Sequence, residues 1–232
     1  MSLDVLAAKD VILLDAGGDP HRSGLRRRSW RGRSGGSKAC RRGLGTCRGQ
    51  GPSLGGRGDP AAAHARELWD GYFSRVLSGA GLEPGAIPAA LEALWSANRR
   101  QGLWRRPLPG VGWALEALHR SGRRLAVVSN AEGQVEADLR AAGLSRWLET
   151  VVDSHLVGVA KPDPEIFAIA LRRLGVGAEQ AFYVGDVPAF DVEGARRAGL
   201  PAVLIDPWGV HEDCDAVRIA SLAALPALLG GE

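Results

Sequence analysis

Cysteine is scarce in this sequence, with three residues, Cys40, Cys47 and Cys214, among 232. An odd number without a CxxC pair provides neither a disulfide framework nor a paired cysteine metal site, and it favours a reducing compartment. The sequence also lacks the run of roughly 18 apolar residues that a membrane span needs, and its start lacks the basic, apolar and small-residue order of a secretory signal. We therefore expect a soluble, cytoplasmic protein that does not contact membranes.

The length and hydrophobic content limit the number of domains. A chain of 232 residues that is 45% hydrophobic can bury one full α/β core and still carry a smaller accessory domain. We therefore expect one or two domains. The sequence does not indicate the oligomeric state.

Residues 19–58 differ in composition from the rest of the chain. They include ten Arg, one Lys, eleven Gly and a single Asp, and they contain no Val, Ile, Phe, Tyr, Met or Glu. Such a segment has almost nothing apolar to offset the entropy of ordering it, so we predict disorder. Without these residues the 29 basic and 26 acidic residues of the chain fall to 18 and 25, a net charge of −7. The excess positive charge therefore belongs to this segment alone.

Three interpretations of residues 19–58 stay open. An Arg/Gly-rich arm would bind RNA through its charge and through stacking of Arg on bases, but Trp30 is its single aromatic residue, which argues against nucleic-acid binding. A flexible linker is the second interpretation. The third, which we favour, is a reading-frame error that replaced native helical sequence.

The rest of the chain alternates between strand and helix patterns. An apolar run at 11–15 ends in Asp15 and two glycines, which is typical of a buried parallel strand that enters a turn. Further strands are predicted at 125–129, 150–153, 181–185 and 202–206, and helices at 111–120, 134–142, 164–174, 192–198 and 222–229. This order predicts a Rossmann-like, three-layer α/β core in which helices cover both faces of a parallel sheet.

Two further helices are predicted without a strand between them, at 61–77 and 88–98. We interpret residues 19–105 as a small helical cap inserted into a core made of residues 1–18 and 106–232.

Polar side chains follow four of the predicted strands or their loops. These are Asp15, the pair Ser129 and Asn130, Lys161, and the segment from Asp186 to Asp191. Each has an ordinary explanation as a turn or helix-capping residue. Because the carboxyl ends of parallel strands meet at one edge of a sheet, we expect them to share a crevice.

Four segments in this order resemble the motifs of the haloacid dehalogenase superfamily. They read DAGG at 15–18, VVSN at 127–130, KPDPEIF at 161–167 and GDVPAFD at 185–191. The resemblance covers residues 8–18 and about 59–232, and it includes a helical cap between the first two motifs, as in subfamily I. Residues 19–58 match nothing in the family.

The resemblance implies a role for each of these residues. Asp15 would be the nucleophile that forms an aspartyl-phosphate, and Lys161 would neutralise the charge that it shares with the phosphoryl group. Gly18, Ser129, Asn130 and Lys161 would bind the phosphoryl group. Mg²⁺ would be bound by Asp15, Asp186 and the carbonyl of Gly17, while Asp191 would support the metal through water or orient Lys161.

The motif after the nucleophile departs from the family at two positions. Phosphatases of this family usually carry a second Asp two residues after the nucleophile, as the general acid and base, where this chain has Gly17. General acid–base help is worth roughly 10² to 10⁴ in rate, so we expect a slow phosphatase. The usual Thr after the glycines is replaced by Asp19, whose charge opposes a phosphate. A one-base shift in the codons of residues 19–21 can read Thr-Leu, as the family has there, which is why we favour the frame error.

Three functions remain in competition. The first is a Mg²⁺-dependent phosphatase of a small phosphorylated metabolite, with the cap selecting the substrate. The second is a 2-haloacid dehalogenase, which uses the same Asp and Lys without a metal, and the paired Asp186 and Asp191 argue against it. The third is an inactive relative that binds a phosphorylated ligand or a partner protein, suggested by Gly17 and Asp19.

Overall fold

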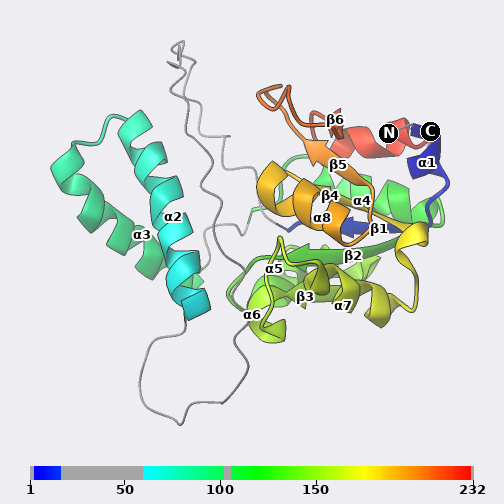
Figure 1. Cartoon of the computed structure of the whole chain (residues 1–232), viewed down its shortest axis with the longest axis horizontal. Helices are drawn as coiled ribbons and strands as arrows, with labels where there is room; N and C mark the ends of the chain where they lie inside the picture. The colour runs from blue at the N-terminus through cyan, green and yellow to red at the C-terminus, as the bar shows by residue number, and fades with distance from the viewer. Residues whose placement is uncertain (1–2, 17–59, 102–105, 231–232) are drawn as a thin grey trace, which may run out of the picture. The chain divides into compact units, whose positions relative to one another are not determined.

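The computed structural model describes residues 3–16, 60–101 and 106–230, and the predictions for residues 19–58 lie outside these ranges. The chain divides into two compact units, residues 1–20 with 97–232, and residues 21–96. The first unit holds the sheet, and the second contains all of helix α2 and most of helix α3 (Figure 1). Among the described residues, no helix combines the length and apolar content that crossing a bilayer requires.

The first unit is built on a six-stranded sheet in which every neighbouring pair is parallel. Figure 1 shows the strands in the order β3-β2-β1-β4-β5-β6, from the bottom of the view to the top. The strands are β1 (Val11–Leu14), β2 (Arg124–Ser129), β3 (Leu148–Asp153), β4 (Ala181–Gly185), β5 (Ala202–Ile205) and β6 (Val217–Ile219). The chain winds outward from β1 to β3, then returns to the other side of β1 with β4. The switch point, where ligands bind in such sheets, therefore lies beside β1.

Alternate residues of the strands enter two separate hydrophobic cores. Val11 and Leu13 of β1 face the core that α7 (Pro164–Leu174) and α8 (Glu193–Arg197) cover. Ile12 and Leu14 face the opposite core, which contains residues of α1 (Leu3–Ala7), α4 (Val111–Arg120) and α9 (Leu225–Leu228). Helices on both faces explain why β1 is apolar throughout, since no side of it meets water. The predicted three-layer α/β fold is confirmed.

The boundaries of α7 follow from its capping residues. Asp163 precedes the helix and accepts a hydrogen bond from the Glu165 amide, while Pro164 occupies the first turn, where its missing N–H costs nothing. Gly175 ends the helix at φ 68°, a left-handed conformation that glycine adopts without strain. The predicted range 164–174 is confirmed.

Some short elements were not predicted from the sequence. Strand β6 has three residues with Arg218 at its centre, too short and too polar for a strand pattern. The predicted helix at 192–198 corresponds to α8, and the five-residue π-helix that precedes it, η5 (Pro188–Val192), was not predicted. The remaining elements are α5 (Val135–Ala141), α6 (Ser154–Val157), η3 (Ser145–Trp147), η4 (Ala178–Gln180) and η6 (Leu222–Ala224).

The second unit contains α2 (Pro60–Gly79), η2 (Pro84–Ala86) and most of α3 (Ile87–Gln101), close to the two predicted cap helices. Arg66 of α2 pairs with Glu92 of α3 over 3.0 Å, and its guanidinium lies 4.7 Å from the centre of the Trp95 ring. These contacts join the two helices. The cap limits of 19 and 105 stay predictions.

Candidate active site

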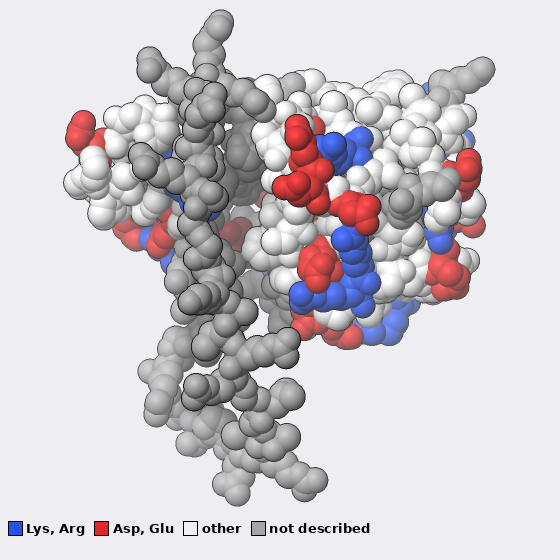
Figure 2. Space-filling model, turned by 45° about the horizontal axis from the view of Figure 1, so that its top comes forward, with Lys and Arg blue, Asp and Glu red and all other residues white. Residues whose placement is uncertain are grey.

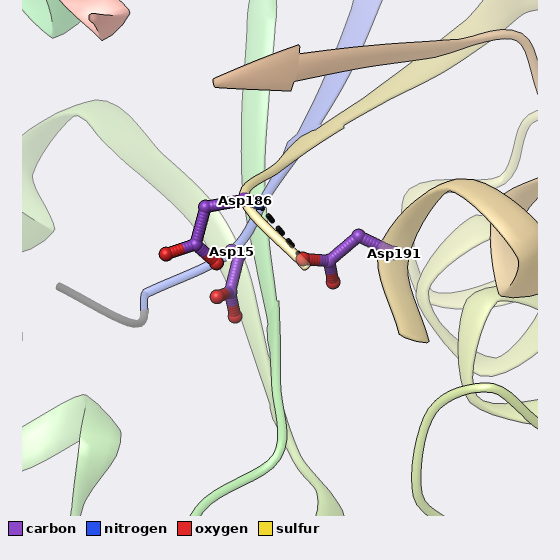
Figure 3. A group of neighbouring side chains, drawn as sticks. All are labelled: Asp15, Asp186 and Asp191. Atoms are coloured by element: carbon purple, nitrogen blue, oxygen red, sulfur yellow. Dashed lines mark hydrogen bonds between the residues drawn. The ribbon is translucent and has the colours of Figure 1, made fainter. Parts of the chain in front are cut away.

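Asp15 and Asp186 follow the neighbouring strands β1 and β4. Leu14 pairs with Val184 in the parallel register, and the Asp15 amide donates a 2.8 Å hydrogen bond to the Val184 carbonyl. Asp15 thus leaves its strand beside Gly185, one residue before Asp186. Figure 3 shows the carboxylates of Asp15 and Asp186 close together at this edge of the sheet. The two acidic residues therefore meet at the switch point.

Asp191 approaches the same place from η5 (Figure 3). Its Oδ2 accepts hydrogen bonds from the amides of Asp186 and Val187 at 2.9 and 2.8 Å, and its Oδ1 accepts from Lys161 and Tyr183 at 2.8 and 3.2 Å. A carboxylate has about four lone-pair sites, so these donors use its acceptor capacity. Of the two roles expected for Asp191, the orientation of Lys161 is the one that these contacts favour.

Gly185 is the residue that lets Asp191 approach so closely. A Cβ atom at position 185 would lie 2.3 Å from Cγ of Asp191 and 2.4 Å from its Oδ2. Any side chain there would displace the Asp191 carboxylate. The close approach of Asp191 therefore explains why the fourth motif has glycine immediately before Asp186.

Lys161 lies at the centre of the acidic group. Its Nζ donates to Asp15 Oδ1 at 2.7 Å, to Asp191 Oδ1 at 2.8 Å and to the Tyr183 hydroxyl at 2.8 Å. The side chain is buried, with 3% of its surface exposed. Burial alone would lower the pKa of Lys161, but the carboxylates of Asp15 and Asp191 outweigh it and raise that pKa above its usual value. The ammonium is therefore charged at neutral pH.

The second motif lies beside Lys161. Ser129, which is buried, ends β2, and the Asn130 side chain then makes a reciprocal pair of hydrogen bonds with the backbone of Lys161. Its Oδ1 accepts from the Lys161 amide at 2.7 Å, and its Nδ2 donates to the Lys161 carbonyl at 3.0 Å. This contact sets the loop that carries Lys161 against the end of β2.

Asp153 fixes the loop that follows Asn130. The buried carboxylate ends β3, and it accepts hydrogen bonds from the amides of Gly133 at 2.9 Å and His155 at 3.0 Å. The conformation of the loop after Asn130 is therefore held by a side chain from β3 as well as by contacts within the loop.

The structure brings most of the predicted site residues to one edge of the sheet. One group contains Asp15, Lys161, Asp186 and Asp191. Ser129 ends β2, the strand next to β1, and Asn130 follows it. The predictions for Gly17 and Gly18, including the metal-binding carbonyl of Gly17, lie outside the described residues.

Sequence reasoning missed Tyr183. Its ring is buried in β4, and its hydroxyl reaches both Lys161 and Asp191. The available signal was one phenol within an otherwise apolar strand, three residues before the motif aspartate Asp186. The sequence pattern predicts a strand at 181–185 and gives no further role to this residue.

The donor set suits a hard divalent cation. Asp15, Asp186 and Asp191 each offer one carboxylate oxygen, and these atoms all lie within 4.8 Å of one another. Carboxylate oxygens are the ligands that Mg²⁺ prefers in proteins. Because the acceptors of Asp191 are already used, Asp15 and Asp186 are the better candidates for direct contact with the ion.

The charges on the visible face of the first unit are mixed. Figure 2 shows acidic and basic side chains side by side there, without a field of one sign. The ion pairs of the first unit include Arg172 with Glu165 and Arg197 with Glu193. Among the described residues, the face in view therefore carries both signs of charge interspersed.

The sequence matches a known family and its curated members. The family described as haloacid dehalogenase-like hydrolase matches residues 86–205. The phosphoserine phosphatase of Thermus thermophilus is 36% identical over 156 residues, which cover 67% of this chain and 61% of that relative. The phosphoglycolate phosphatase of Cupriavidus necator is 42% identical over 127 residues, 52% of this chain and 54% of the relative. The matched region thus spans about half to two thirds of these relatives.

Solved structures share the fold. A haloacid dehalogenase-type phosphatase from Thermococcus onnurineus has a TM-score of 0.52 and 26% identity, covering 75% of this chain and 92% of that one. A 2-haloacid dehalogenase from Pseudomonas syringae has a TM-score of 0.52 and 28% identity, covering 74% of each chain. The fold is thus similar to both a phosphatase and a dehalogenase, and the choice between them depends on the site.

Proposed function

Because this chain belongs to the haloacid dehalogenase-like hydrolase family, we propose that it is a Mg²⁺-dependent phosphatase that hydrolyses a small phosphorylated metabolite through an aspartyl-phosphate on Asp15. The observation that carries the proposal is the position of the Lys161 ammonium, 2.7 Å from Asp15 and 2.8 Å from Asp191, beside the Asp186 carboxylate. A nucleophilic carboxylate, a fixed cation and a second carboxylate for a metal are the parts that phosphoryl transfer needs.

In the proposed reaction a carboxylate oxygen of Asp15 attacks phosphorus, and the bond from phosphorus to the ester oxygen breaks. The Lys161 ammonium offsets the charge of Asp15 and of the arriving phosphoryl group. The Ser129 hydroxyl and the Asn130 backbone amide hold phosphoryl oxygens. A bound Mg²⁺ would supply further positive charge toward those oxygens. Water then hydrolyses the aspartyl-phosphate and regenerates Asp15.

The general acid is the part that the sequence lacks. The leaving alcohol needs a proton and the attacking water must lose one, and Gly17 has no side chain to exchange either. We therefore propose a slow enzyme that favours good leaving groups.

The names of the relatives support a class of substrate. Those compared above are named for phosphoserine and phosphoglycolate, both small phosphate monoesters. We propose a substrate of this kind for this chain. The enzyme would act in the cytoplasm. Helices α2 and α3 would belong to the cap that selects the substrate.

Phosphate release from an aryl phosphate tests the proposal. The whole chain is assayed with Mg²⁺, with excess chelator, and with Mg²⁺ restored. We expect turnover with Mg²⁺, a loss to background with chelator, and recovery when the ion returns, because the carboxylates of Asp15 and Asp186 would otherwise repel an anionic substrate. Turnover that is equal in chelator would contradict the metal requirement.

Dehalogenation is the second candidate function, favoured by the likeness to a 2-haloacid dehalogenase. It would use Asp15 and Lys161 without a metal. Halide release from a 2-haloacid, measured beside phosphate release, separates the two functions. We expect phosphate release alone, since the neighbouring carboxylates of Asp15 and Asp186 suit a metal ion that dehalogenation does not use.

A further inference from the structure

Tyr183 is a polar side chain in a strand that is otherwise apolar. The strand β4 reads Ala-Phe-Tyr-Val-Gly, and all of its residues are buried. The Tyr183 ring meets Phe167 edge-on, with 4.9 Å between the ring centroids. A phenylalanine at position 183 would make the same ring contact. Packing therefore explains the ring and leaves the hydroxyl unexplained.

The hydroxyl of Tyr183 lies where three groups meet. It is 2.8 Å from Lys161 Nζ, 3.0 Å from the Val128 carbonyl oxygen and 3.2 Å from Asp191 Oδ1. Val128 belongs to β2, two strands away from β4 in the sheet. The hydroxyl thus connects the strand that ends in Ser129 to the lysine and to the fourth motif.

The proton positions follow from the donors and acceptors available. An ammonium has three donors and no acceptor, so Lys161 donates to Tyr183, as it does to Asp15 and Asp191. The single proton of the Tyr183 hydroxyl is then shared between the Val128 carbonyl at 3.0 Å and Asp191 Oδ1 at 3.2 Å, with the carbonyl as the nearer acceptor. All three ammonium protons are consequently used, and the hydroxyl is the only neutral acceptor among their three partners.

We propose that Tyr183 is a positioning residue whose hydroxyl, held by the Val128 carbonyl, sets the Lys161 ammonium midway between Asp15 and Asp191. This inference rests on the proposed function, because it concerns how Lys161 serves Asp15. Two carboxylates alone leave a flexible four-carbon side chain free to turn about the line that joins them. A third contact, anchored on the rigid backbone of β2, removes that freedom.

The position of the ammonium matters because it is shared between nucleophile and substrate. Phosphoryl transfer depends on fixed charges that are in place before the reaction, and a displaced ammonium would stabilise the transition state less than it stabilises the bound substrate. Loss of the hydroxyl should therefore lower kcat with little effect on KM.

The test compares Tyr183→Phe with Phe182→Leu in the whole chain. The first variant removes only the hydroxyl and keeps the ring contact with Phe167. The second truncates the neighbouring core residue, which faces the opposite side of the sheet, and so lowers stability without touching Lys161. With an aryl phosphate and Mg²⁺, Tyr183→Phe should lower kcat about 10- to 100-fold with KM within about 2-fold, while Phe182→Leu should leave kcat per folded molecule unchanged.

A second measurement does not depend on activity. The ¹H–¹⁵N signal of the Lys161 ammonium, assigned by its absence in Lys161→Arg, reports how fast its protons exchange with water. Exchange should be slow in the unchanged protein and in Phe182→Leu, and at least about 10-fold faster in Tyr183→Phe, because one ammonium proton then has no acceptor.

The two measurements separate the possible failures. If the unchanged protein releases no phosphate, the proposed function fails, and the ammonium signal still decides the role of Tyr183. Equal ammonium exchange in Tyr183→Phe and the unchanged protein would overturn the inference, as would an unchanged kcat. If Tyr183→Phe does not fold, the folding of the double variant Tyr183→Phe with Lys161→Met is compared with that of Tyr183→Phe alone. Folding recovered there supports the inference, and continued failure to fold overturns it.

Discussion

Replacement of Asp15 by Asn is expected to lower kcat for phosphate release by at least about 10⁴-fold. The amide keeps the size of the side chain but loses the charge and the nucleophilic oxygen, so no covalent intermediate forms. Lys161 retains its contact with Asp191, and the fold should survive. Steady-state phosphate release, with the fold monitored by circular dichroism, checks this result.

Asp10 provides the matched control for Asp15. It is an exposed aspartate at the other end of β1, away from the carboxyl edge of the sheet. Asp10→Asn should therefore retain the activity of the unchanged protein. Activity retained in Asp15→Asn would exclude this residue as the nucleophile.

Replacement of Gly17 by Asp should raise kcat about 10² to 10⁴-fold, the reverse of the usual mutational loss. The new carboxyl would stand two residues after the nucleophile, where phosphatases that resemble this chain carry their general acid and base. The gain should be larger for an alkyl phosphate than for an aryl phosphate, because the poorer leaving group needs the proton more. Parallel kcat measurements on the two substrates check this prediction.

Gly17→Asn is the control for that gain, since it has the same shape but cannot exchange a proton near neutral pH. It should show no increase in rate. An equal gain in both variants would point to packing as the cause. No gain in Gly17→Asp, combined with Mg²⁺-dependent binding of phosphate analogues, would favour the inactive, ligand-binding relative.

Most of the core was predictable because its central strands, β1 and β4, are almost entirely apolar. A strand that is buried on both faces, such as β1 or β4, has a short continuous run of apolar residues that can be recognised in the sequence. The ends of helix α7 can be recognised from Asp163 and Pro164 at its start and Gly175 after its last residue. The strand β6 was not predictable, because its pairing with β5 supplies the stability that its own sequence lacks.

The site was predictable only as far as its motifs extend. The sequence indicated Asp15, Lys161, Asp186 and Asp191, since these residues follow strands that share an edge. It did not indicate that the Asn130 side chain would hold the backbone of Lys161, because that pairing joins residues 31 apart. Nor did it identify Tyr183, whose role depends on hydrogen-bond directions rather than on residue spacing.

The central claim is that Asp15 takes the phosphoryl group, and a covalent adduct tests it most directly. The whole chain is incubated with Mg²⁺ and an aryl phosphate, quenched in acid and mapped by peptide mass spectrometry. Because Gly17 provides no base for the hydrolysis step, the intermediate should accumulate, and the peptide that contains Asp15 should gain the mass of one phosphoryl group. Release of phosphate with that peptide unmodified, or with the group on another residue, would contradict the account.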